Sequence, residues 1–123
     1  MNPALVIYTN RFVGNGFAGR SFGPLVFIRP EYKDDRGLLE HEFQHSRIFW
    51  RTLGIAGLEY LLSDTAKLQQ EVECYKVQLK VTTEDKQLNM AQVENLTRTF
   101  AGFISTRYGL GISVTDAFKL LTT

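Results

Sequence analysis

The sequence predicts an α+β fold in which a small antiparallel β-sheet packs on three to four helices. The first 30 residues hold two short runs of β-branched and aromatic residues, whereas apolar residues recur at helical spacing from about residue 34 onward. The chain has 123 residues, 44% of them hydrophobic and 22% charged, as is usual for one globular domain with its own core. We therefore expect a single domain over residues 1–123.

Two strands are expected in the first quarter of the chain. Ala4–Val13 mixes β-branched and aromatic residues, and Pro24–Pro30 is an apolar run bounded by prolines. The dipeptide Asn15-Gly16 between them favours a tight turn, so a hairpin or small antiparallel sheet is expected. The glycines of residues 14–19 also match the G-x-G-x-x-G dinucleotide fingerprint, but that motif opens a helix, and here a strand follows. The turn interpretation is therefore preferred.

Helices are expected over the remainder of the chain. Asp34 or Asp35 can cap the first one, and glycines after Leu53 end it. Ser63 can cap a second long helix, and the sequence Ser-Val-Thr-Asp from Ser113 resembles a capping box. The expected helices run from about residue 34 to 53, 63 to 81, 85 to 108 and 113 to 121, with a short helical turn at 58 to 62.

Charge and composition exclude several functions. A formal net charge of +1 gives no electrostatic reason to expect a nucleic-acid or anionic membrane partner. The single cysteine, Cys74, cannot form an internal disulfide, and no segment resembles a signal peptide or reaches the length of a membrane-spanning helix. We expect a cytoplasmic protein. The sequence does not predict its oligomeric state.

Both histidines of the chain lie in one segment of the first expected helix, where residues 41–45 read H-E-F-Q-H. His41 and His45 are four residues apart, so they share a helix face and can bind one zinc ion, Zn²⁺, together. Glu42 lies one step around the helix, where it can act as general base on a zinc-activated water. The alternative is a chance pair of surface histidines, which the absence of any other histidine makes harder to accept.

A catalytic zinc site takes three protein ligands, and the sequence limits the third to a carboxylate or Cys74. Glu71 is favoured. His45 lies eight residues before the end of its helix and Glu71 eight residues into the next long one, so both stand about 12 Å from the turn between antiparallel helices. Glu73 and Asp64 are the next choices, and Cys74 is more typical of a core thiol.

The H-E-F-Q-H segment followed 26 residues later by Glu71 resembles the gluzincin type of zinc metallopeptidase, in particular the small single-domain minigluzincins. The resemblance covers about residues 24–78. It implies a zincin-like fold in which His41, His45 and Glu71 bind zinc. It also implies that the zinc-activated water hydrolyses a peptide bond in a peptide or protein substrate, with Glu42 as the general base.

The resemblance leaves the remaining site residues open. Tyr75 stands where the family often has an aspartate that orients the first histidine, a role that Asp34, Asp35 or a backbone carbonyl would have to fill. The family's transition-state donor is a histidine or tyrosine, which leaves Tyr60, Tyr75, Tyr108 or Arg107. In zincins an extended substrate commonly lies along an edge strand before the active helix, here Leu25 to Arg29.

Two other functions are weighed against peptide hydrolysis. Residues 23–30 are also similar to short proteins carried by bacteriophages and prophages. The alternative function is a catalytically silent zincin-like metal-binding module, because the domain is small and the sequence does not identify its transition-state donor. Such a module could have a structural or partner-binding role as a phage accessory protein. Hydrolysis of a non-peptide amide is a third hypothesis.

Overall fold

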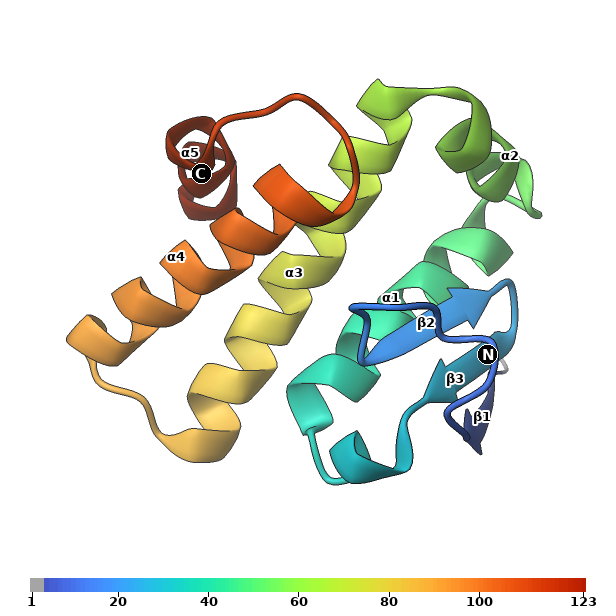
Figure 1. Cartoon of the computed structure of the whole chain (residues 1–123), viewed down its shortest axis with the longest axis horizontal. Helices are drawn as coiled ribbons and strands as arrows, with labels where there is room; N and C mark the ends of the chain where they lie inside the picture. The colour runs from blue at the N-terminus through green and yellow to red at the C-terminus, as the bar shows by residue number, and fades with distance from the viewer. Residues whose placement is uncertain (1–3) are drawn as a thin grey trace.

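The computed structural model describes residues 4–123, and within this range it confirms the α+β class with a three-stranded sheet and five α-helices (Figure 1). The expected single domain begins at residue 1, and residues 1–3 lie outside the described part. None of the helices in that part is long and apolar enough to cross a membrane. The elements are β1 (Leu5–Tyr8), β2 (Gly19–Phe22), β3 (Leu25–Ile28), the short 3₁₀-helix η1 (Pro30–Tyr32), α1 (Arg36–Arg51), α2 (Ile55–Leu62), α3 (Asp64–Lys86), α4 (Met90–Arg107) and α5 (Val114–Thr122).

The sheet is mixed, whereas the sequence predicted an antiparallel one. Its order is β1-β3-β2, with β1 parallel and β2 antiparallel to β3. The difference arises because an unpredicted strand, β2, forms the hairpin with β3 through Gly23, whose φ of 57° suits a tight turn. Because β3 is paired on both sides, Leu25–Ile28 cannot receive a further strand. The expectation that this segment is the substrate edge strand is therefore wrong, and the edges are β1 and β2.

The helices stack in succession away from the sheet. Figure 1 shows the sheet against α1, α3 beside α1 in the opposite direction, and α4 on the far side of α3 with α5 against it. The β2–β3 turn is tied to α1, since the Ser46 hydroxyl donates a 2.7 Å hydrogen bond to the Gly23 carbonyl. The interface between α1 and α3 thus lies in the middle of the molecule.

Two apolar cores flank this central interface, which holds buried polar side chains beside a small apolar cluster of Ile48, Ala56 and Cys74. One core joins α3, α4 and α5, and the other joins the sheet to α1. Burying polar groups costs free energy unless they find partners, so a polar layer between two apolar cores indicates a function. Its buried polar side chains are His41, Glu42, Glu71, Gln78 and Thr82.

Three boundaries differ from those expected: the end of α3, the length of α2 and the start of α4. The last of these helices begins at Met90 and not near residue 85, because Asn89 caps it. Asp35 caps α1 by accepting from the Leu38 amide, and Ser63 caps α3 by accepting from the Ala66 amide, as expected. The threonines at 82 and 83, however, do not end α3, which continues to Lys86. Thr82 is packed so closely against α1 that a Cβ at Gly37 would overlap its hydroxyl, and this tertiary contact overrides weak helix propensity. Likewise, the short turn expected at 58–62 is a full helix, α2.

Candidate metal centre

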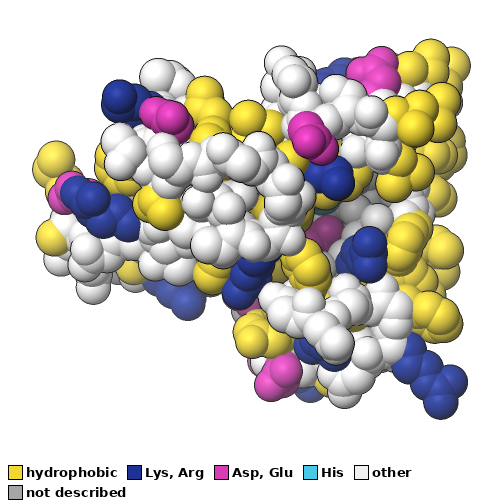
Figure 2. Space-filling model, turned by 45° about the horizontal axis from the view of Figure 1, so that its top comes forward, with side chains coloured by type: hydrophobic (Ala, Val, Ile, Leu, Met, Phe, Trp, Pro, Cys, Tyr) yellow, Lys and Arg dark blue, Asp and Glu magenta, His cyan; other side chains and the backbone are white. Residues whose placement is uncertain are grey.

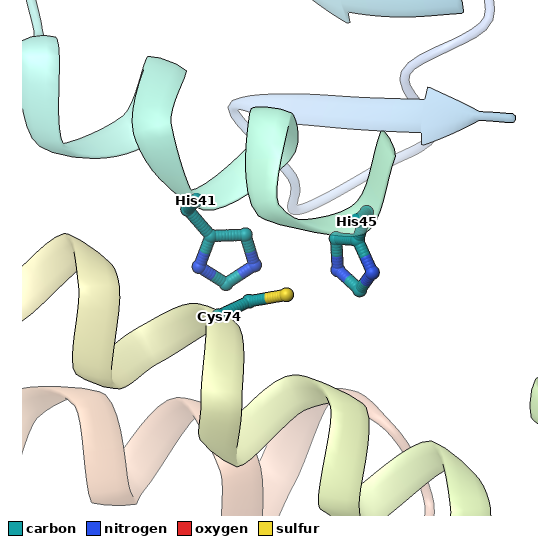
Figure 3. A group of neighbouring side chains, drawn as sticks. All are labelled: His41, His45 and Cys74. Atoms are coloured by element: carbon teal, nitrogen blue, oxygen red, sulfur yellow. The ribbon is translucent and has the colours of Figure 1, made fainter. Parts of the chain in front are cut away.

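The histidine pair, His41 and His45, extends from α1 toward α3. The His41 side chain is 4% exposed and that of His45 14% exposed, so the site is buried on one side and reaches solvent on the other. Figure 3 shows both rings projecting from one face of α1 toward α3. The i, i+4 spacing on a helix therefore directs both rings to the same side of α1, as the sequence predicted.

Glu71 on α3 meets the histidine pair. One of its carboxylate oxygens lies 3.2 Å from Nε2 of His41 and 3.3 Å from Nε2 of His45, and the side chain is only 2% exposed. Burial would raise the Glu71 pKa, but the two imidazoles outweigh it and hold this pKa well below its usual range. The other oxygen accepts a 2.6 Å hydrogen bond from the Tyr60 hydroxyl. Glu71 is thus fixed as a carboxylate facing both rings.

The two other carboxylates considered from the sequence lie elsewhere. The Glu73 side chain is 41% exposed and pairs with Arg51 at 3.7 Å. Asp64 is exposed at the start of α3. Of the three acidic candidates, Glu71 is the one that the structure brings to the histidine pair.

The distances from the two histidine nitrogens to the Glu71 oxygen are compatible with ligands of one small cation. Hydrogen bonds between a charged nitrogen and a carboxylate are typically about 2.7–2.9 Å long, shorter than the 3.2–3.3 Å found here. Donors about 2.0–2.1 Å from a tetrahedral zinc ion stand about 3.3–3.4 Å from one another. Two imidazoles and a carboxylate are also ligands that zinc commonly takes in proteins.

Cys74 forms a second group with the histidine pair. Its side chain is fully buried on α3, and one ligand atom from each of His41, His45 and Cys74 lies within 4.8 Å of the other two. Figure 3 shows its sulfur turned toward the space between the two rings. Burial raises the Cys74 pKa to about 11, although His45 opposes the shift. The sequence favoured a core thiol without a role at the site. The three-residue spacing between Glu71 and Cys74, which puts both on one face of α3, was the signal that could have predicted the position of Cys74 beside the histidine pair.

Glu42 is buried beside this cluster on the side of the sheet. A Cβ added to Gly19 of β2 would stand 3.3 Å from its Cγ, so the strand passes directly over the side chain. Burial raises the Glu42 pKa, while the two histidines and a hydrogen bond from Ser21 oppose the shift. A carboxyl group with a raised pKa holds a proton more readily than an ordinary glutamate, which is a property of a general base and acid.

The aromatic residues around the cluster have separate roles. The Tyr75 ring meets the His41 ring edge-on, with centroids 4.4 Å apart, but its hydroxyl is 2.9 Å from that of Tyr108. Within residues 4–123, Nδ1 of His41 has no hydrogen-bond partner, so Tyr75 supports that ring by packing alone. Among the expected transition-state donors, Tyr60 is the one that contacts Glu71, and Arg107 lies over the Phe103 ring.

Comparison of the chain with protein-family models, with curated proteins and with solved structures finds no match.

Proposed function

We propose that the protein is a zinc-dependent, gluzincin-like metallopeptidase of the cytoplasm. The observation that carries the proposal is the convergence of the histidine pair and Glu71, at 3.2–3.3 Å, with Glu42 buried beside them. This is the donor set and base that water-mediated hydrolysis at a zinc ion requires.

Each residue of the site would have a separate role in hydrolysis. His41, His45 and Glu71 would hold the ion, and Tyr60 would keep the Glu71 carboxylate in place. A bound zinc ion supplies Lewis acidity, which lowers the pKa of water toward neutrality and polarises a carbonyl group. Glu42 would accept the proton from water and deliver it to the leaving amine.

Substrate binding is assigned to the free edge of β2. Within residues 4–123 this strand pairs with β3 on one side only, and it packs on α1 directly over Glu42. An extended peptide could add to that edge by main-chain hydrogen bonds. Figure 2 shows a face of the molecule that is hollowed near its middle, with an acidic side chain at the bottom of the hollow. Such a surface is compatible with a substrate of extended shape.

The alternative function is a metal-binding module without catalysis, and one observation favours it. Structural zinc sites are closed by four protein ligands, and the Cys74 thiol lies close enough to the histidine pair to be considered as a fourth. A chain that keeps all four side chains bound to zinc permanently would lack the position that water needs. Such a chain could serve as the structural or partner-binding module expected from the sequence.

Proteolysis of a peptide library by the zinc-loaded protein, read by mass spectrometry, separates the two functions. Glu42→Gln should keep its zinc and lose about 10²- to 10⁴-fold in turnover, because a general base contributes about that much. Glu40→Gln is the matched control, since Glu40 lies on the same helix and pairs with Arg47 at 3.4 Å. Absence of cleavage by both the wild type and a Cys74→Ala chain, or equal cleavage by Glu42→Gln and the wild type, would reject the peptidase.

A further inference from the structure

Cys74 is a buried thiol that the proposed hydrolytic mechanism does not use. It belongs to a small apolar cluster with Ile48 and Ala56, and that cluster alone would explain its burial. Its sulfur, however, is turned toward the histidine pair, with the three ligand atoms within 4.8 Å of one another (Figure 3). Packing alone does not require a thiol to face the ring nitrogens of two histidines.

We propose that Cys74 is a fourth protein ligand of the metal centre, beside the histidine pair and Glu71. The inference rests on the proposed metal site and adds to it a closed resting state. Glu71 and Cys74 are three residues apart on α3, so both side chains face α1 without any change of the backbone. Thiolate sulfur is among the ligands that zinc prefers, and each additional ligand increases the affinity of the site.

The chemistry of closure involves one proton and no change of oxidation state. On closure the S–H bond of Cys74 would break and its proton would leave to solvent. The thiolate sulfur would then take the fourth position of the metal ion, and the water molecule held there would be released to solvent. The fourth position is then occupied by protein. Water gains access only when the thiolate dissociates, so Cys74 would slow hydrolysis in the resting protein.

Cobalt binding tests this ligand without relying on activity. Co²⁺ replaces zinc in such sites, and a thiolate ligand gives an intense charge-transfer absorption in the near ultraviolet. Cys74 is the single cysteine of the sequence, so such a band in the wild-type chain can come from no other residue. We expect the band in the wild type and its loss in Cys74→Ala. Zinc binding should weaken about 10²- to 10³-fold in that variant, because one of four ligands is lost.

The outcomes separate this inference from the proposed function. Cobalt that binds to the wild type without a charge-transfer band would overturn the Cys74 ligand and leave the histidine pair with Glu71 intact. A chain that binds no cobalt and no zinc would overturn both proposals. Because the decisive spectrum is that of the wild type, the test stands even if Cys74→Ala fails to fold.

Discussion

Replacement of Glu71 by glutamine tests the ligand set directly. The change keeps the size of the side chain, and the amide oxygen can still accept the hydrogen bond from Tyr60. It removes the negative charge that faces the histidine pair at 3.2–3.3 Å. Glu73→Gln is the matched control, because it makes the same chemical change two residues away, at a side chain that is 41% exposed and paired with Arg51.

The expected magnitude follows from the number of ligands. Apparent binding free energies of structural zinc sites are about 10–16 kcal/mol for four ligands, or about 2.5–4 kcal/mol for each. Loss of the Glu71 carboxylate should therefore weaken zinc binding about 10²- to 10³-fold. Glu73→Gln should change the dissociation constant less than about threefold, because exposed ion pairs contribute little.

Competition with a chromophoric chelator at fixed pH measures both dissociation constants, and circular dichroism of the metal-free chains checks that each variant is folded. A Glu71→Gln chain that binds zinc as tightly as the wild type would refute the geometric argument. So would a larger loss in Glu73→Gln than in Glu71→Gln.

Two further predictions concern packing and pH. Gly37→Ala should lower the free energy of unfolding by about 1–3 kcal/mol, because its Cβ would overlap the Thr82 hydroxyl. Gly102→Ala should raise it by about 0.5–1 kcal/mol, because among the described residues the added Cβ would meet nothing within 4 Å beyond its own helix backbone. Denaturant unfolding compares the two, and an equal effect of both changes would contradict the close helix approach. Burial lowers the His45 pKa, but Cys74 and Glu71 together outweigh it and raise this pKa well above 6.5. Zinc affinity should therefore fall by up to about tenfold per pH unit once the pH drops below the His45 pKa. Below that pKa a proton occupies the ring and competes with the metal, so chelator titrations that give one affinity across the neutral range would contradict the assignment of His45 as a ligand.

Local sequence patterns predicted the helices that carry the site better than they predicted the sheet. The caps at Asp35 and Ser63 depend on neighbouring residues, so they could be identified from the sequence. Strand β2 could not, because the sequence Gly-Arg-Ser-Phe has little apolar alternation, and its formation depends on pairing with β3. The parallel pairing of β1 with β3 follows from that extra strand.

In the candidate site, too, features set by local helix geometry could be predicted from the sequence, whereas features set by tertiary packing could not. Helical spacing put the histidine pair on one face and Glu71 level with it, because both depend on the rise per residue of two antiparallel helices. The orientation of the Cys74 thiol depends on side-chain packing between α1 and α3, which no sequence period encodes. The contact of Tyr60 with Glu71 depends on α2, a helix that the sequence indicated only as a short turn.

The central claim is that two imidazoles from α1 and a carboxylate from α3 bind one cation. Mass spectrometry of the intact chain under native conditions, after zinc is added and the excess removed, tests it most directly. We expect one zinc ion per wild-type chain, and none on a chain in which both histidines are replaced by alanine. A wild-type spectrum with only the mass of the metal-free protein would contradict the account.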